Sequence, residues 1–458
     1  MRSFRIVRTL LPWVVSLLRD RRRWVLWGAP ARRTPEFHQA RARGIVADIA
    51  SLGPTFVKLA QVFAARADLI GEPYIGELST LHDQVPAVPF EAIEREILAA
   101  YDVPADTLFE RFDRTPVAAA SLGQVHRASY KGRDVAVKVL RPGVEQLIAS
   151  DLRIARRIMG WVARQWPNPH MRGTLSVIEE FAARIHEEMD FCLEAEYATE
   201  IGHNFAGEPQ VIVPGIVHEL TRARVLVLDF VEGRRIDRLE VGSDEARRIT
   251  AVLIEMYVQM MLIDGLFHAD PHPGNLLVAA DGRLVLLDFG MVVRVAPETR
   301  LRLIRTVLAA VRQDGEGIVD GFNALGLIAP GADMTEIRRL VDLLLNTAYR
   351  QDTTTQDRIK MMLADRVMHA LYDFPIVLPR DMVYFARTAS LIEGIGTRYD
   401  PYFQAIPVAS PIVLRMRSRI LRSLGETPAP SVAELATIAG FAAGKMWKRF
   451  RSSFLAKR

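Results

Sequence analysis

The sequence predicts an α+β fold that is mainly helical, and two observations lead to this prediction. Apolar residues recur at helical spacing over most of the 458 residues. The pattern changes at 123–140, where alternating residues, the turn Lys131-Gly132-Arg133 and a valine-rich run predict a β-hairpin. A shorter pair of strands is expected at 276–279 and 283–287, on either side of Asp281-Gly282.

The remaining elements follow in order along the chain. A basic lead at 1–35, with breaks expected at Pro12 and Pro30, precedes helices over 36–83. Within them Gly53-Pro54-Thr55 begins a new helix, because the fixed φ of proline suits a first turn. A buried strand is expected at 225–230, and further helices at 89–100, 144–166, 174–206, 244–265 and almost continuously from 297.

Cysteine content and charge narrow the functional classes. The single cysteine, Cys192, excludes an intramolecular disulfide, and we expect it to be a buried apolar residue. The net charge is +5, but residues 1–33 carry +8 and residues 445–458 carry +6, so the body between them carries −9. An acidic body argues against a nucleic-acid partner, because such proteins carry their basic charge on the folded domain.

The two basic ends also contain apolar and aromatic residues, which leaves two interpretations open. They are either anchors for an anionic membrane surface or solvated tails. No transmembrane span is expected, since the apolar runs 10–18 and 251–267 are too short or too interrupted. The start of the chain also lacks the features of a signal peptide. We expect a cytoplasmic enzyme, which would be peripheral on the inner face of the membrane if the basic ends are anchors.

Three motifs contain the polar groups that phosphoryl transfer from ATP requires. Lys138 ends the run Val135-Ala136-Val137-Lys138, where a cation is costly to bury without an anionic partner. Asp270 and Asn275 lie five residues apart in a loop rich in proline and glycine. Asp288 begins Asp288-Phe289-Gly290, directly after the short hairpin. This order and spacing are typical of protein kinases.

The kinase pattern assigns a role to each of these residues. Lys138 would contact the phosphates, Asp270 would act as the base, and Asn275 and Asp288 would hold Mg²⁺. Taken alone, the tetrapeptide that ends in Lys138 is also typical of an edge strand whose lysine faces water. His268 and His272 suggest zinc binding beside Asp270, but the sequence offers no further histidine or cysteine ligand nearby, so zinc is discounted.

The segment expected to cover the nucleotide departs from the usual glycine-rich loop. In the same register the chain reads Val117-Ala118-Ala119-Ala120-Ser121-Leu122-Gly123-Gln124-Val125, and only one of the usual glycines remains. Because alanine does not readily reach positive φ, we expect a stiffer loop. The candidate glutamate partners of Lys138, Glu188 and Glu194, are fifty or more residues away, which predicts a helical insertion. Ala296-Pro297-Glu298 is interpreted as a helix start rather than the end of a peptide-binding segment.

Together these residues resemble the UbiB/AarF family of atypical, coenzyme Q-associated kinases, from about residue 40 to about residue 400. The similarity includes the alanine-rich loop and His268 to Asn275. It also includes Glu188-Met189-Asp190 followed by Glu194-Ala195, and an N-terminal motif made of 53–61, Arg66, Asp68 and 83–86. Position 60 is alanine where the family motif has glycine, which we expect to loosen or shift the extension that carries the motif.

The resemblance implies a two-lobed protein-kinase-like fold with an N-terminal helical extension. The implied segments are a basic lead (1–35), the extension (36–115), an N-lobe (116–233), a C-lobe (234–425) and a basic tail (426–458). In that family the extension restricts access of protein substrates. Carried over, Lys58 and Gln61 lie on one helix face and point at the nucleotide, Glu188 and Asp190. Glu188 would pair with Lys138, and Glu194 would support the same network.

The sequence therefore predicts Mg²⁺-ATP binding, followed by ATP hydrolysis or phosphorylation of a small or lipid-associated acceptor. The resemblance implies a role in ubiquinone or related isoprenoid-lipid metabolism, with an isoprenoid lipid or quinone precursor as partner. Two alternatives stay open. One is a small-molecule kinase of the aminoglycoside-phosphotransferase type, and the other is a non-catalytic, nucleotide-gated lipid-binding scaffold.

Overall fold

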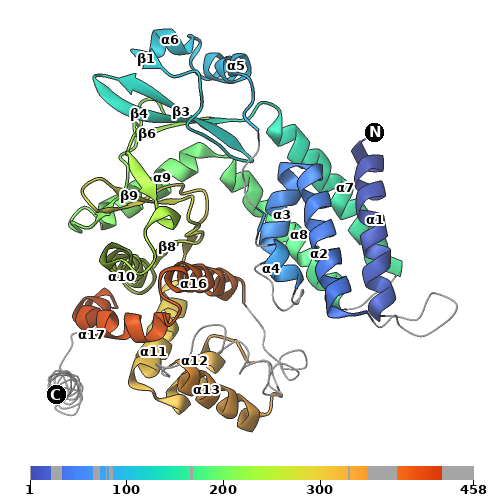
Figure 1. Ribbon diagram of the computed structural model, residues 1–458, viewed down its shortest axis with the longest axis vertical. Helices are drawn as coiled ribbons and strands as arrows, with labels where there is room; N and C mark the ends of the chain where they lie inside the picture. Colours follow the sequence, from blue (N-terminus) through green and yellow to red (C-terminus); the bar gives the residue numbers. More distant parts are fainter. Residues whose placement is uncertain are drawn as a thin grey trace.

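The computed structural model describes residues 2–21, 33–64, 73–78, 80–81, 86–165, 169–328, 331–348 and 379–424. Over these residues the chain has the predicted α+β fold, with a small lobe that contains a sheet, a larger helical lobe and a helical bundle beside them (Figure 1). The expected break at Pro30, the motif residues Arg66, Asp68 and 83–85, and the tail at 426–458 lie outside the described residues.

The small lobe is an antiparallel sheet with the strand order β1-β3-β4-β6, and β2 also pairs with β3. The predicted hairpin is confirmed, because Lys131 and Gly132 take positive φ values of 50° and 71° at its turn. The strands are β1 (Arg111–Phe112), β2 (Ala118–Ala119), β3 (Gly123–Tyr130), β4 (Arg133–Leu140) and β6 (Val225–Asp229).

Two helices precede the strands of this sheet, and the first of them packs against it. Helix α5 (Phe90–Tyr101) buries Ile93 and Ile97 against Val135 and Val137 of β4, and the short α6 (Ala105–Leu108) follows it. Burial of such aliphatic side chains is the main favourable contribution to this packing. The segment boundary expected at residue 116 stays a prediction.

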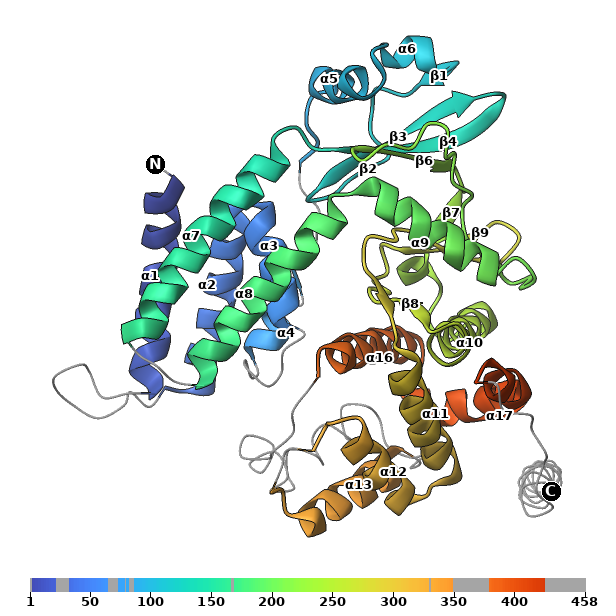
Figure 2. The same ribbon diagram turned by 180° about the vertical axis from the view of Figure 1, so that it is seen from behind.

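The N-terminal helices pack on the inserted helices to form one bundle (Figure 2). The predicted insertion after β4 is confirmed as the pair α7 (Val144–Gln165) and α8 (Pro169–Glu188). Leu52 and Phe56 share a buried cluster with Ile6 on one side and Ile154 on the other. The N-terminal members are α1 (Arg2–Arg21), α2 (Pro35–Leu52), α3 (Pro54–Ala64) and α4 (Tyr74–Leu78).

The expected break at Pro12 is wrong, since α1 continues through this residue. An interior proline costs about 3 kcal/mol in a helix. Contacts on both sides of Pro12 hold α1 against the bundle. Arg2 donates to both carboxylate oxygens of Asp151, at 2.8 and 2.6 Å, and the Trp13 indole donates to Asp48 at 2.6 Å.

The single helix expected at 174–206 is also wrong, because the chain forms two helices that meet near Met189. Helix α8 ends at Glu188, and α9 (Phe191–Asn204) begins after Asp190, whose carboxylate accepts a hydrogen bond from Cys192 N at 3.0 Å. Aspartate is a favoured N-cap because it satisfies an otherwise unpaired N–H of the first turn. Cys192 is exposed rather than buried, contrary to our expectation.

The larger lobe is mainly helical, with short strands that hold the loops of the site. The helix expected at 244–265 forms as α10 (Asp244–Val258), but its end is a π-helical turn, η2 (Gln259–Asp264), which ends at Gly265 with a φ of 67°. The Gln259 side chain donates to Asn204 O at 3.0 Å from this wider turn. Such turns are frequent near functional sites.

The rest of the larger lobe consists of short strands and further helices. The strands are β5 (Val211–Ile212), β7 (Gly233–Arg235), β8 (Leu266–His268), β9 (Leu276–Ala279), β10 (Leu284–Leu286) and β11 (Val292–Arg294). The helices are η1 (Ile236–Arg238), α11 (Pro297–Arg312), α12 (Gly315–Ala324), α13 (Met334–Ala348), α16 (Arg380–Tyr399) and α17 (Ala405–Ser423). None of the helices in the described ranges is both long and apolar enough to cross a bilayer.

Candidate active site

A lysine with two acidic partners forms the centre of the site. Lys138 Nζ donates to both oxygens of Glu194, at 2.7 and 2.9 Å, and to Asp288 Oδ1 at 3.0 Å. The fold thus joins β4, the first turn of α9 and the segment after β10. The ammonium group also lies 5.1 Å from the centre of the Phe191 ring, a distance at which a cation is attracted to an aromatic face.

The expected pairing of Glu188 with Lys138 is wrong. Glu188 pairs with Lys58 of α3, at 3.3 Å, and Glu194 takes the place beside Lys138. The reason is the helix break at Asp190. Glu188 is the last residue of α8, in the bundle, whereas Glu194 lies in the first turn of α9, which packs beside the sheet.

Burial and charge act in opposite directions on the pKa values of this cluster. Burial alone would lower the pKa of Lys138, but Asp288 and Glu194 outweigh it, so its pKa is raised. Burial raises the pKa of Glu194 to about 7, although Lys138 opposes the shift. For Asp288 burial is outweighed by Lys138 and Lys58, which hold its pKa well below the usual range. Asp288 therefore stays ionised at neutral pH.

The segment that begins with Asp288 is fixed by its backbone. Asp288 has a φ of 60°, an uncommon value that aspartate tolerates better than most side chains. Phe289 N lies 3.3 Å from Glu194 Oε1, and Gly290 N donates to Asp288 Oδ1 at 3.3 Å. Since the Phe289 side chain is fully buried, these contacts hold the Asp288 carboxylate toward Lys138.

His268 links the two loops of the site through both ring nitrogens. Nε2 lies 2.6 Å from Asp288 O, and because a carbonyl only accepts, Nε2 carries the proton. Nδ1 is then the acceptor for Asp270 N at 3.3 Å and for the Tyr257 hydroxyl at 3.2 Å. Burial lowers the pKa of His268, which favours this neutral form. This histidine therefore has a positioning role in the described structure.

The catalytic-loop residues predicted from sequence lie together, and the structure adds an arginine that sequence reasoning missed. Asn275 Nδ2 donates to Asp270 O at 3.1 Å, and Leu287 N donates to Asn275 O at 2.8 Å. Arg387 of α16 donates to Asp270 Oδ1 at 2.9 Å. Arg387 lies 117 positions from its partner in a helix without a recognisable motif, so no sequence signal identified it.

The alanine-rich loop lies at the end of the hairpin that carries Lys138. Val125 is directly opposite Lys138, and β2 pairs Ala118 with Val125 and Ala119 with Gln124. The loop continues through Ala120 to the buried residues Ser121, Leu122 and Gly123, whereas Val117 is exposed. A Cβ at Gly123 would lie 3.1 Å from Val139 O, so this close strand approach favours glycine.

The extension motif meets the site at its edge. Lys58 reaches Glu188, as the resemblance implied, and Gln61 Nε2 donates to Leu81 O at 3.2 Å. Asp190 is exposed and caps α9. Ala60 is 3% exposed and packs in a cluster with Leu78 and Leu81, so its methyl group is part of the packing of the extension.

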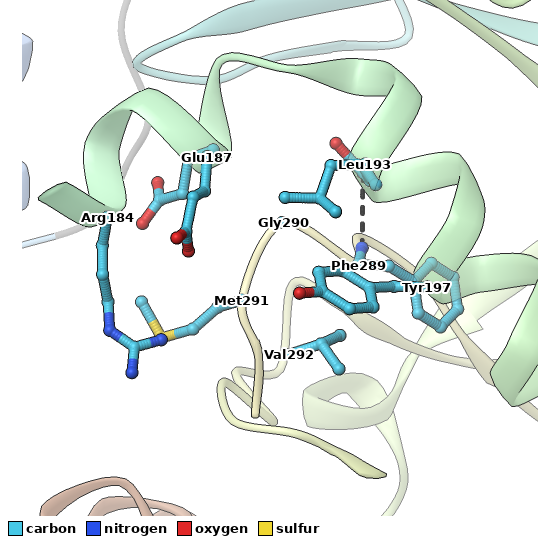
Figure 3. A pocket seen from close by; sticks show the side chains of 10 residues that line it. Arg184, Glu187, Leu193, Tyr197, Phe289, Gly290, Met291 and Val292 are labelled. Atoms are coloured by element: carbon cyan, nitrogen blue, oxygen red, sulfur yellow. Dashed lines mark hydrogen bonds between the residues drawn. The ribbon is translucent and has the colours of Figure 1, made fainter. Parts of the chain in front are cut away.

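A narrow cleft separates the inserted helix α8 from the Phe289–Val292 segment (Figure 3). Arg184 and Glu187 lie on the α8 side of this cleft, and Leu193 and Tyr197 come from α9. Arg184 also stacks over the Tyr384 ring of α16, with its guanidinium carbon 4.1 Å from the ring centre. The inserted helices therefore contact both lobes near the site.

Comparison with known proteins agrees with this geometry. A family model for the ABC1 atypical kinase-like domain matches residues 80–321, which is more than half of the chain. The chain belongs to the ABC1 atypical kinase-like family. This membership confirms the resemblance that the sequence motifs indicated.

Relatives in the ABC1 family match most of this chain. An uncharacterised protein of Synechocystis sp. is 34% identical over 412 residues, which cover 89% of this chain and 70% of that protein. The protein ACTIVITY OF BC1 COMPLEX KINASE 3, chloroplastic, of Arabidopsis thaliana is 35% identical over 369 residues, which cover 79% of this chain and 51% of that protein. This chain therefore spans only about half of the length of the plant relative.

A solved structure supports the fold of this ABC1 family member. The complex of Rv3197 with erythromycin from Mycobacterium tuberculosis superposes with a TM-score of 0.56 at 24% identity, covering 80% of this chain and 97% of that chain. At this identity the likeness concerns the fold alone. With the ABC1 match it confirms the predicted α+β, kinase-like fold.

Proposed function

We propose that the protein binds ATP with Mg²⁺ and transfers or hydrolyses its terminal phosphoryl group. The observation that carries the proposal is the Lys138–Glu194 pair beside Asp288, a lysine held for phosphate contact next to an ionised carboxylate. Phosphoryl transfer depends mainly on positioning and charge stabilisation, and this arrangement offers both.

Asp288 and Asn275 fit the ligand set that Mg²⁺ prefers. Mg²⁺ is usually bound by one or two protein oxygen ligands together with phosphate oxygens and water. No cluster of three or more metal-binding side chains occurs in the described part of the chain, so a site completed by the nucleotide suits these two residues. Bound there, Mg²⁺ would neutralise charge that develops on the phosphates.

Asp270 would orient the nucleophile, either an acceptor hydroxyl or water. Arg387 occupies one carboxylate oxygen, Oδ1, and fixes the plane of the group. The second oxygen would then accept the hydrogen bond from the nucleophile. An oriented carboxylate of this kind is the usual base in kinase-like sites.

We infer that the acceptor is small or lipid-associated rather than a protein. Only eight residues lie between Asp288 and Pro297, where α11 begins, and β11 within this segment pairs with β8. This leaves no long segment to hold a peptide substrate. The helical extension adjoins the site through Lys58 and Glu188, which adds to the restriction. From the resemblance of the sequence motifs to the UbiB/AarF family, we propose a role in isoprenoid-lipid or ubiquinone metabolism.

We also propose that α1 faces an anionic membrane surface. Its inner side buries Ile6, whereas its outer side exposes apolar residues at helical spacing, namely Phe4 (71% exposed), Val7, Leu11 (53% exposed) and Val15. Arg8 lies four residues after Phe4, on the same face of the helix, and is also exposed. An apolar strip accompanied by arginine is typical of helices that lie in the bilayer interface.

The proposed activity is tested by measuring Mg²⁺-ATP hydrolysis with and without phosphatidylglycerol vesicles. Asp288→Asn should abolish turnover, and Asp281→Asn is the matched control, because Asp281 is an exposed aspartate paired locally with Arg283. Equal rates of ATP hydrolysis by the wild type and Asp288→Asn would refute the proposed enzymatic activity. Nucleotide binding without turnover in the wild type would favour the non-catalytic scaffold instead.

The membrane proposal has its own readout, sedimentation with vesicles of phosphatidylcholine alone or mixed with phosphatidylglycerol. Leu11→Asp should reduce binding to the anionic vesicles about tenfold or more, whereas Leu98→Asp on α5, where Leu98 is 45% exposed, should not. Equal binding by both variants, or a change in oligomeric state as the sole effect of Leu11→Asp, would refute it.

A further inference from the structure

Arg141 lies between the alanine-rich loop and Pro86, in the part of the helical extension that precedes α5. It follows β4 directly, three residues after Lys138. Its Nε donates to Ala120 O at 2.7 Å, and its Nη2 donates to Pro86 O at 3.0 Å. One planar guanidinium group therefore contacts two backbone carbonyls whose positions differ by more than thirty residues.

A buried glutamine repeats this connection one strand away. Gln124, which is fully buried, accepts a hydrogen bond from Val88 N at 2.9 Å and donates to Val88 O at 3.3 Å. On the other side of the loop, Leu122 shares a buried cluster with Leu59 of α3. The loop thus meets the helical extension at two places, at Leu59 of α3 and at Pro86 and Val88, which follow α4.

We propose that Arg141 is a positioning residue that couples the alanine-rich loop to the helical extension, so that the phosphate end of the nucleotide site takes its shape only when the extension is docked. The inference deepens the proposed function and rests on it. Arg141 contacts the loop backbone and not the reacting atoms, and it acts through the position of Ala120.

The fork of the guanidinium group is the reason why arginine serves here. Arginine presents several N–H donors in one rigid plane, so that two acceptors are satisfied at a fixed separation. A lysine keeps the positive charge but has a single ammonium group on a flexible stem. Arg141→Lys should therefore lose the coupling although it keeps the charge, which a purely electrostatic role would not predict.

The test compares nucleotide affinity and amide hydrogen exchange in the full chain. Arg141→Ala should bind Mg²⁺-ATP about tenfold more weakly, since hydrogen bonds from charged donors are lost. In the same variant, amide hydrogen exchange should increase at both Ala120 and Val88. Arg141→Lys should behave like Arg141→Ala. Arg133→Ala is the matched control, because Arg133 begins the same strand with an exposed side chain that pairs with Asp229.

Three results would overturn the proposal. These are wild-type affinity in Arg141→Ala, full rescue by Arg141→Lys, or increased exchange at Ala120 without a change at Val88. If Arg141→Ala does not fold, Arg141→Gln and Arg141→Lys replace it in the comparison. Failure of the wild type to bind Mg²⁺-ATP would refute the proposed function instead, and exchange in the nucleotide-free protein would still decide whether Arg141 couples the two segments.

Discussion

Glu194 offers the sharpest test of the site, because its pKa and its contacts predict separate effects. The structure places its carboxylate, 3% exposed, on Lys138, and burial raises its pKa from 4.5 to about 7. A shift of this size corresponds to about 3 kcal/mol. Because the pKa is raised, the folded state binds more protons than the unfolded chain between these two values. This group's contribution to stability is present below pH 4.5 and is lost as the pH rises through 7.

Glu194→Gln removes this titration and the charge partner of Lys138. The free energy of unfolding of the variant minus that of the wild type should therefore increase by about 3 kcal/mol between pH 4.5 and 7.5. The altered hydrogen bonds of the variant add a cost that is the same at pH 4.5 and at pH 7.5, so this cost does not contribute to the change with pH. Turnover of Mg²⁺-ATP should fall about 100-fold, because Lys138 loses the partner that orients it.

The two readouts are urea unfolding across this pH range and a steady-state ATPase assay. Glu188→Gln is the matched control, since Glu188 pairs with Lys58 and should affect turnover less than Glu194→Gln. A difference in stability that does not change with pH, or a larger loss of turnover in Glu188→Gln, would refute the reasoning.

Three further predictions concern residues around the site. Gly123→Ala should lower the free energy of unfolding by about 2 kcal/mol in urea titrations, because its Cβ would lie 3.1 Å from Val139 O within a sheet that cannot easily shift. Arg387→Ala should reduce kcat about tenfold with little change in the KM for ATP, since Arg387 holds Asp270 rather than the nucleotide; an increase in KM alone would contradict this role. Burial raises the pKa of Asp264 to about 6, so its contribution to stability is lost as the pH rises through 6. Asp264→Asn should remove that slope in thermal unfolding at several pH values, and an unchanged slope would exclude Asp264 as its source.

The sequence was sufficient to predict those parts of the fold and the site that depend on residues close together in the chain. The hairpin of β3 and β4, the loop from Asp270 to Asn275 and the segment after Asp288 are each defined within a few residues, and the fold brings them together. The inserted helices α7 and α8 were also predictable, because the distance from Lys138 to its glutamate partner required extra chain.

Sequence reasoning failed where a choice depended on tertiary packing. Glu188 and Glu194 would both have belonged to one continuous helix, and only the cap at Asp190 separates them into two elements that face different partners. Arg387 and Arg141 were missed for a related reason. Their partners are a carboxylate and two carbonyls that approach them only after the lobes and the extension have assembled.

The bundle that joins α1–α3 with α7 and α8 has a consequence for synthesis of the protein. Arg2 and Asp151 are 149 positions apart, and the apolar faces of the first helices pack on helices that end at Glu188. At typical translation rates the ribosome needs on the order of 10 s to extend the chain from α3 to the end of α8. Until α7 has been made, Leu52 and Phe56 lack their contacts with Ile154 and Ile158, so part of their apolar surface stays exposed to solvent.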